Sequence, residues 1–545
     1  MLWFNPFLQR WRRPCYWAID LAAAGFFLWI AAHFYVQGKG FTYLIRFGDE
    51  PERHRISELQ STGYYVHRDS YGYDGQYYAQ LAVKPRPSDR DLRAAMDNLP
   101  YRARRILFCW TAHVLGLGQP RWVLEAFALQ NIAAWLLLAW VLLRWFPPTE
   151  ADNVVRWLGT MFAWGLTLSV SGALPDGPSL LLIACGVALA ERGRPWLSAG
   201  LLGVAGLGRE TSLLAGLIHL PGKEWSRREM LRAVGRGAVV VAPLTIWSAW
   251  LWHVAGGPGN AGANNFSPPF VGYLHKWSET LRELHASGWS SPARWSLLLL
   301  ISLAVQFMMI FLRPRWTSPW WRIGAAYAVL MVFLGDGVWE GFPGAAARVV
   351  VPLTLAFNVV VPRGRWWWMV LLVMGNLSAL SAVSQLATPG SRSYRLEGVQ
   401  AIAVDSSSPP VAVTFDSQWY ESEHSMFEYW RWSRGSAGIV IQNQRATPIE
   451  VELDFDLRAI DERTVRVFQG QTFRWEGRVG RENSAVRLSR ITLAPGDNPW
   501  RFETDTPPGV PNGDTLRPVA FNLRNLVIRV VRARSSGLSA PRGAL

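Results

Sequence analysis

The sequence predicts a polytopic α-helical membrane protein with an all-β domain at its C-terminus. Half of the 545 residues are hydrophobic, only 17% are charged, and 31 are tryptophan. Apolar runs separated by short polar loops fill the chain up to about residue 385, whereas residues after about 400 have the composition of a soluble domain. The formal net charge is +15, but the basic residues gather at the ends of apolar segments, as in cytoplasmic loops. We therefore expect membrane insertion and no nucleic-acid partner.

The first apolar run, residues 16–36, follows Arg10, Arg12 and Arg13 and predicts a retained first helix with a cytoplasmic N-terminus. Residues 106–118 are apolar but too short to cross a bilayer, so we expect an interfacial helix there. The sequence predicts about 9–11 transmembrane helices in all. Spans after the first are expected near 122–146, 155–173, 178–192, 235–254, 294–312, 322–335, 347–362 and 366–385.

The segment 196–220 has two interpretations. A single pass would place the following basic cluster outside, against the positive-inside rule, and would bury Arg209 and Glu210 at mid-membrane. A re-entrant hairpin of two half-helices that turns at Gly208, Arg209 and Glu210 avoids both problems, and we favour it. The C-terminal domain then lies on the side opposite the N-terminus.

The first external loop, residues 37–105, contains the most informative local sequence. Asp74 lies in the run GYDGQYY at 72–78, beside Tyr77 and other aromatic residues that can stack on sugars. A partly dry site is expected to raise the basicity of this carboxylate, which suits a general base. The alternative is that Asp74 caps the following helix while the tyrosines anchor at the membrane interface. Asp49 and Asp69 are further carboxylate candidates in this loop.

Other charged residues fall at external helix ends. Asp176 is either a site residue or the N-cap of a helix that follows Pro175. Arg348 at the outer interface suits a phosphate ligand, and its alternative is a salt bridge to Glu340 or Asp336. Arg209 and Glu210 either serve the site or neutralise each other.

Metal and cofactor signatures are missing from the sequence. The nine histidines have no metal-ligand spacing, and there is no phosphate-cradling Gly-Lys-Ser/Thr loop and no dinucleotide fingerprint. None of the three cysteines, Cys15, Cys109 and Cys185, lies in the C-terminal domain, so that domain has no disulfide framework. A divalent metal is possible but is not indicated.

The C-terminal region is expected to comprise a linker at 391–407, a β-sandwich or jelly roll at 408–535 and a flexible tail at 536–545. Residues 451–457 alternate apolar and polar side chains, and similar short runs recur between turn signals. Trp419, Trp430 and Trp432 lie next to charged residues and suit carbohydrate recognition. The alternative is that these indoles pack inside the sandwich.

Residues 1–390 resemble the GT-C glycosyltransferases, integral membrane enzymes that use polyprenyl-phosphate sugars as donors. The resemblance rests on GYDGQYY at 72–78, YRARRIL at 101–107 and GRET at 208–211. It implies that Asp74 deprotonates the acceptor hydroxyl and that transfer inverts the anomeric carbon. It also implies that Arg348, with Arg102, Arg104 or Arg105, steadies the donor phosphate. The loop has no compact Asp-x-Asp pair, since Asp69 and Asp74 are five apart, and this weakens the case for a bound metal.

The resemblance further implies a bacterial inner membrane location, with the C-terminal domain periplasmic or extracellular. The partners would be membrane lipid, the polyprenyl-phosphate sugar, and a glycan, lipid or protein acceptor. The alternative function is a polysaccharide transporter or a non-enzymatic envelope-assembly protein with a carbohydrate-binding domain. Paired broken helices would favour transport, and only the segment 196–220 is expected to be broken.

Overall fold

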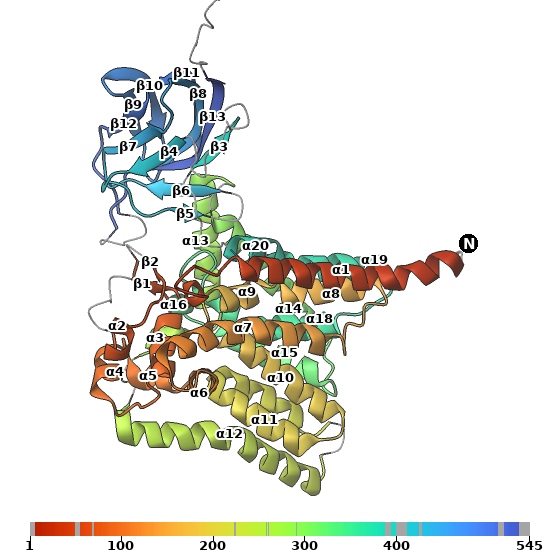
Figure 1. The fold of residues 1–545 in the computed structure, drawn as a ribbon. Helices are drawn as coiled ribbons and strands as arrows, with labels where there is room; N and C mark the ends of the chain where they lie inside the picture. Colours follow the sequence, from red (N-terminus) through yellow and green to blue (C-terminus); the bar gives the residue numbers. More distant parts are fainter. Residues whose placement is uncertain are drawn as a thin grey trace, which may run out of the picture. The chain divides into compact units, whose positions relative to one another are not determined.

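A computed structural model describes residues 6–48, 55–67, 70–222, 225–257, 259, 261–289, 292–386, 394–398, 411–424, 428–510 and 517–533. The chain divides into two compact units, Met1–Pro389 and Gly390–Leu545. The first unit is helical and the second is built of β-strands (Figure 1). This confirms the predicted fold class, a helical membrane part followed by an all-β domain.

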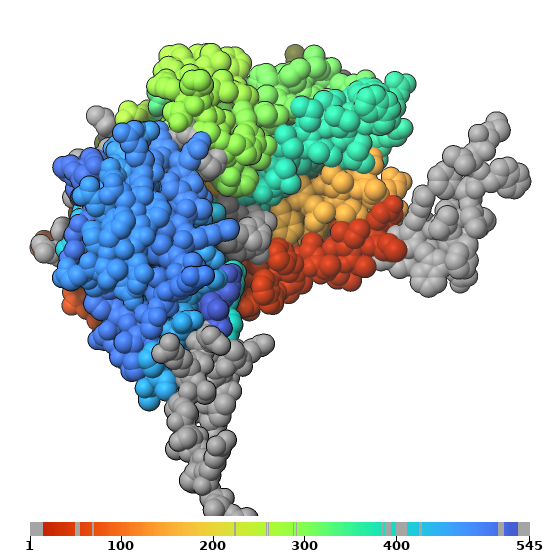
Figure 2. All heavy atoms as spheres, turned by 90° about the horizontal axis from the view of Figure 1, so that it is seen from above, coloured from red at the N-terminus to blue at the C-terminus, as the bar shows by residue number. Residues whose placement is uncertain are grey.

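Four helices among the described residues are long and apolar enough to cross a membrane. They are α1 (Pro6–Ala32), α7 (Pro120–Leu142), α12 (Arg227–Ala255) and α14 (Ala293–Leu312). Helix α1 runs along the shorter α8 (Ala151–Met161), as both views show (Figures 1 and 2). By these four helices the chain is a membrane protein, while the larger number of spans and the orientation stay predictions.

The remaining helices of the first unit are shorter. One group comprises α2 (Ser57–Gln60), α3 (Gly75–Val83), α4 (Arg90–Ala94), α5 (Leu99–Ala103), α6 (Leu107–Leu115), α13 (Val271–Ser287), α16 (Asp336–Trp339) and α17 (Ala346–Val349), with the 3₁₀ turns η1 (Thr42–Ile45) and η4 (Ala263–Asn265) and the short strands β1 (Phe47–Gly48) and β2 (Val66–His67). The others are α9 (Trp164–Ser171), α10 (Asp176–Glu191), α11 (Pro195–Gly208), η3 (Glu210–His219), α15 (Pro319–Val332), α18 (Val351–Val360), α19 (Trp366–Met374), η5 (Leu377–Ser381) and α20 (Ala382–Gln385).

Three predicted spans, 155–173, 347–362 and 366–385, are each interrupted, and the prediction of continuous helices there is wrong. Buried side-chain amides connect these three spans to one another. Asn358 donates to the Thr160 hydroxyl at 3.0 Å and exchanges hydrogen bonds of 2.9 and 2.7 Å with Asn376. Because polar groups buried in an apolar interior need partners, these bonds tie the broken segments together.

The segment 196–220 folds as a hairpin, and the turn predicted at Gly208, Arg209 and Glu210 is confirmed. Helix α11 ends at Gly208, and η3 begins at Glu210 and runs back beside it. The Ser198 hydroxyl near the start of α11 lies 3.4 Å from Nε2 of His219 at the end of η3. The two arms are therefore antiparallel, and the charged turn lies at the far end of the hairpin from Ser198.

The open end of this hairpin is held by the buried guanidinium of Arg322. Its Nη1 donates to the carbonyl oxygens of Ile218 and Leu220 at 3.0 and 2.6 Å, and its Nη2 donates to that of Pro221 at 3.1 Å. Its Nε donates to Trp316 at 2.6 Å. Carbonyls at the C-terminal end of a helix have no partner within the helix, and a cation there also complements the helix dipole.

We expect Arg322→Ala to destabilise the helical unit by about 3 kcal/mol, because it leaves several carbonyls of the hairpin end unsatisfied. Thermal unfolding of the purified protein in detergent, followed by tryptophan fluorescence, measures this effect. Arg315→Ala removes an exposed arginine from the neighbouring loop and is the matched control. An unfolding midpoint of Arg322→Ala equal to that of the control would show that the guanidinium does not hold the hairpin.

The second unit is a sandwich of two sheets (blue in Figure 2). One sheet has the order β10-β9-β12-β7-β4, and the other has the order β11-β8-β13-β6-β5 with β3 added to β13. Inward residues alternate with outward ones along β8, and the inward set joins one apolar core. The strands are β3 (Arg395–Glu397), β4 (Val411–Phe415), β5 (Glu423–His424), β6 (Tyr429–Trp432), β7 (Ala437–Asn443), β8 (Ile449–Ala459), β9 (Arg463–Gln469), β10 (Thr472–Val479), β11 (Ser484–Leu493), β12 (Gly496–Thr504) and β13 (Phe521–Ala533).

The indoles proposed as a sugar platform have different surroundings. Trp419 is 5% exposed, packs against Phe502 and Phe521 in the core, and donates from Nε1 to the Gly438 carbonyl at 2.9 Å. A sugar platform at Trp419 is therefore wrong, because the ring presents no face to solvent. Trp430 and Trp432 on β6 are half-buried, and their sugar-binding role stays a prediction.

Candidate functional site

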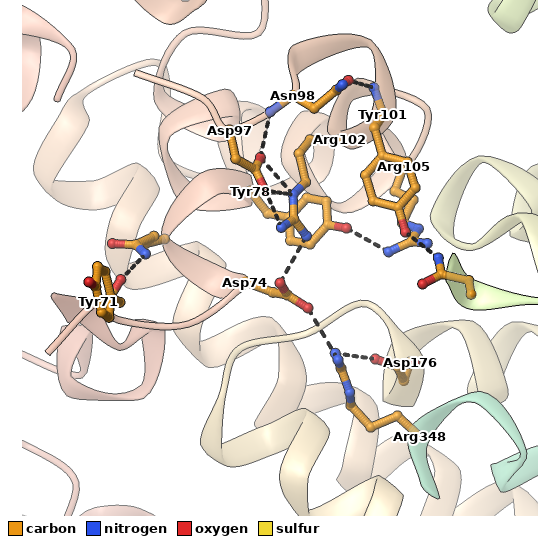
Figure 3. Close-up of polar contacts among 12 residues, drawn as sticks. Tyr71, Asp74, Tyr78, Asp97, Asn98, Tyr101, Arg102, Arg105, Asp176 and Arg348 are labelled. Carbon is orange, nitrogen blue, oxygen red and sulfur yellow. Dashed lines mark hydrogen bonds and ion pairs between the residues drawn. The ribbon is translucent and has the colours of Figure 1, made fainter. Parts of the chain in front are cut away.

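Asp74 lies at the start of α3, and its side chain forms no capping hydrogen bond. Its Oδ1 accepts a hydrogen bond from Arg102 Nη1 at 2.9 Å, and its Oδ2 accepts one from Arg348 Nη2 at 3.1 Å (Figure 3). The helix-cap alternative is therefore wrong for this carboxylate. Asp74 instead connects the start of α3 to Arg348 in α17, which lies 274 residues further along the chain.

Two glycines allow the backbone to place Asp74. Gly72 has a φ of +74°, a left-handed backbone conformation that residues other than glycine rarely adopt. A Cβ at Gly75 would lie only 2.4 Å from the carbonyl oxygen of Gly172. Between them, the Tyr73 amide donates to the Arg46 carbonyl at 2.9 Å. The run at 72–78 thus docks tightly on the turn that precedes α10.

Arg102 is positioned by its own short helix, α5. Asn98 caps that helix by accepting from the Tyr101 amide at 2.9 Å. Asp97 accepts from Arg102 Nε and Nη2 at 3.0 and 2.6 Å, and the Tyr77 ring lies 4.8 Å from the guanidinium carbon. One guanidinium is thereby shared between two carboxylates, which leaves it little rotational freedom.

Arg348 is 8% exposed and connects Asp74 to Asp176. Its Nη1 lies 3.7 Å from Asp176 Oδ2, and the other Asp176 oxygen accepts from Arg209. The alternative salt bridge of Arg348 to Glu340 or Asp336 is wrong, since its ion pairs are with Asp74 and Asp176. The N-cap alternative for Asp176 is also wrong, because Pro175 holds the cap position and the carboxylate binds arginines instead.

The charged turn of the hairpin contributes Arg209 and Glu210 to the same group of charged residues around Asp74. Glu210 accepts two hydrogen bonds of 2.8 Å from Nε and Nη2 of Arg105, whose Nη1 donates to the Tyr78 hydroxyl at 2.7 Å. Arg104 Nη2 lies 3.9 Å from the same carboxylate. Arg209 and Glu210 therefore do not neutralise each other, as one interpretation had it, but pair with residues from different segments.

These residues form what we term the Asp74 cluster. Tyr73 connects it to a further cation, because the guanidinium carbons of Arg46 and Arg348 lie 5.7 and 5.3 Å from its ring. Six guanidinium groups and four carboxylates among the described residues give the cluster a formal charge of +2. Its members are Arg46, Arg102, Arg104, Arg105, Arg209, Arg348, Asp74, Asp97, Asp176 and Glu210.

The electrostatics of Asp74 differ from the expectation of raised basicity. Burial alone would raise its pKa, but Arg348 and Arg102 outweigh burial and lower the pKa to about 2. The side chain is 26% exposed, so part of the carboxylate still faces solvent. The two arginines therefore hold the carboxylate ionised, and with this lowered pKa it is a weak base.

Metal-ligating groups do not gather at the cluster. No group of three or more His, Cys, Asp or Glu side chains in the described part of the chain could hold a metal ion. The candidates Asp49 and Asp69 lie outside the described residues. The carboxylates of the Asp74 cluster are each paired with arginine, an arrangement that suits anion recognition better than cation binding.

Comparisons with known proteins add little. No protein-family model matches the chain, and no curated protein matches it. Among solved structures, the chain is similar to the arabinosyltransferase EmbB from Mycobacterium smegmatis, with 12% identity and a TM-score of 0.33. The match covers 98% of this chain and 66% of EmbB, slightly less than two thirds of that protein. A TM-score this low carries no assignment, so any function rests on the geometry of the site.

Sequence reasoning missed two members of the cluster. Asp97, which holds Arg102 from the opposite side to Asp74, lies five residues before that arginine in a stretch that reads as an ordinary helix start. Arg46 carries no local signal, because its contacts are with Ser171, Tyr73 and the segment around them. Only the folded chain brings either residue to Asp74.

Proposed function

We propose that the chain is a membrane glycosyltransferase that transfers a sugar from a polyprenyl-phosphate donor to an envelope glycan, lipid or protein acceptor. One observation carries this proposal: the Asp74 carboxylate is held between two arginines in a cluster with excess positive charge, in a chain with membrane-spanning helices. Guanidinium groups bind phosphate through paired hydrogen bonds. A carboxylate beside that phosphate is placed to take a proton.

In the proposed reaction, the acceptor hydroxyl attacks the anomeric carbon of the donor. The carbon–oxygen bond to the phosphate breaks, and polyprenyl phosphate leaves with the electron pair. The hydroxyl proton passes to Asp74, and the anomeric carbon is inverted. A donor phosphate that engages Arg102 and Arg348 draws these cations away from Asp74, so its pKa rises above about 2 when the donor is bound.

The direct test is transfer of radiolabelled sugar from a panel of polyprenyl-phosphate donors in membranes that contain the chain. Incorporation into lipid, glycan or protein fractions above that of membranes lacking the chain is the expected result. Movement of an unmodified polysaccharide across proteoliposomes, with no new glycosidic bond, would instead identify a transporter.

The pKa of Asp74 also predicts a pH dependence. Because that pKa is lowered, the ion pairs of Asp74 contribute stability that is fully present above the normal value of 3.8 and lost as pH falls through about 2. Asp74 therefore stays ionised in the free protein from about pH 5 to 8. We expect kcat/KM, which reports the free enzyme, to show no acidic limb from a carboxylate in that range. An acidic limb that disappears in Asp74→Glu or shifts with that change would contradict the ion-paired state.

A further inference from the structure

A cavity of about 750 Å³ lies between α13 and α16, outside the Asp74 cluster. One wall is α13 with the preceding turn η4, and the other is the segment from Asp336 to Glu340. The volume falls within the range of small-ligand sites, which span about 300–1,000 Å³. None of its lining residues belongs to the Asp74 cluster.

Two sets of polar contacts connect the walls of the cavity. His275 Nδ1 lies 3.2 Å from an oxygen of Asp336, which joins α13 to α16. The Lys276 side chain is 2% exposed, and its ammonium donates to Glu279 at 2.8 Å and to the Gly341 carbonyl. The same ammonium lies 4.1 Å from the Phe342 ring. A buried lysine with all of these partners indicates that this wall of the cavity has a defined, well-packed structure.

The charge of the cavity is opposite to that of the Asp74 cluster. Glu279, Asp336 and Glu340 outnumber Lys276 and Arg282, so the formal charge of the lining is −1 with His275 neutral. A phosphate group would be repelled here and attracted by the cluster charge of +2. The two places therefore suit different ligands, an anion at Asp74 and an uncharged or cationic group here.

The lining favours a polyhydroxylated ligand over an apolar one. Carboxylates that accept hydrogen bonds alternate with the donors Arg282 and Asn264, and Ser267 can do either. Phe266, which is 61% exposed, offers an aromatic face at the rim. Sugars present hydroxyls around the ring and apolar C–H groups on one face, and this combination of side chains matches both.

Both walls of the cavity are connected to segments that contribute to the Asp74 cluster. Asn265, next to the lining residue Asn264, donates from its amide to the Tyr101 hydroxyl at 3.3 Å. Tyr101 directly precedes Arg102, and the wall segment that ends at Glu340 continues to Arg348 within eight residues. One wall is thus connected to the segment of Arg102 by a hydrogen bond, and the other wall leads to Arg348 by a short stretch of chain.

We propose that this cavity binds a neutral oligosaccharide, and that the acceptor of the reaction is a glycan whose preceding sugars lie there. The binding site stands on the cavity alone, while the acceptor role rests on the proposed function. Glu340 accepts hydrogen bonds from sugar hydroxyls, and Phe266 stacks on a ring face.

The test is equilibrium binding of mannotriose, maltotriose and arabinotriose to the purified full-length protein in nanodiscs. We expect at least one trisaccharide to bind saturably, and Glu340→Gln and Phe266→Ala each to weaken its binding by about 5- to 10-fold, the effect of one lost hydrogen bond or ring contact. Glu482→Gln and Phe473→Ala, both exposed in the β-sandwich, are the matched controls and should bind as the wild type does. No saturable binding by any of the three, or unchanged binding by both cavity variants, overturns the proposal.

The same samples separate this inference from the proposed function. Asp74→Asn should bind the trisaccharide with wild-type affinity, because its side chain lies in the cluster and not in the cavity lining. If the protein binds the trisaccharide through Glu340 and Phe266 but transfers no sugar from any donor, the glycan site is supported and the proposed glycosyltransferase function is wrong. If it transfers sugar to lipid or protein but binds no trisaccharide, the glycosyltransferase function is supported and the glycan site is wrong.

Discussion

Asp74→Asn is expected to lower sugar transfer by about 10³-fold, within the usual contribution of a general base. The amide keeps the size of the carboxylate but cannot take the acceptor proton. Its oxygen can still accept from one of the two arginines that hold Asp74 at 2.9 and 3.1 Å. The local fold should therefore survive, and the loss should appear in kcat more than in the apparent affinity for the donor. Radiolabelled transfer in membranes, normalised to the amount of protein, measures the effect.

Two matched variants interpret that result. Asp97→Asn removes the carboxylate on the far side of Arg102 and should lower transfer only modestly, since Asp97 orients the arginine and takes no proton. Asp497→Asn changes an exposed carboxylate of the β-sandwich and should leave transfer unchanged. Equal transfer by Asp74→Asn and the wild type would make Asp74 a structural anchor for its two arginines and remove it from the reaction.

Local sequence predicted the parts of the site that local sequence controls. The turn at Gly208 was predictable because a charged pair cannot lie in mid-membrane without partners, and a hairpin gives it some. Asp74 was predictable as a candidate from the aromatic residues around it in the run at 72–78. The ion-pair partners of the charged residues were harder to predict. The alternatives for Asp176 and Arg348 invoked neighbours in sequence, whereas the actual ion pairs join the first loop, α10, the hairpin turn and α17.

The sequence pattern also did not predict which aromatic and amide side chains are buried. Trp419 lies beside charged residues, which suggested an exposed ring, but its side chain fills the sandwich core. The spans 347–362 and 366–385 read as continuous, and their buried asparagines, Asn358 and Asn376, look unremarkable in an apolar run. Each amide finds a partner in another segment, and that pairing exists only after the helices have packed.

Arg348→Ala is expected to lower kcat/KM by about 100-fold, because one charge-assisted hydrogen bond to phosphate contributes about 1.5–3 kcal/mol. The change also removes one of the two cations that lower the pKa of Asp74, so that pKa should rise from about 2. The loss should appear chiefly as weaker apparent donor affinity. Arg348→Lys should restore little, since an ammonium cannot reach Asp74 and phosphate as a planar fork does. Arg315→Ala, at an exposed loop position, controls for loss of positive charge. Unchanged donor affinity in Arg348→Ala would exclude the phosphate role and leave Arg348 only as a tie between Asp74 and Asp176.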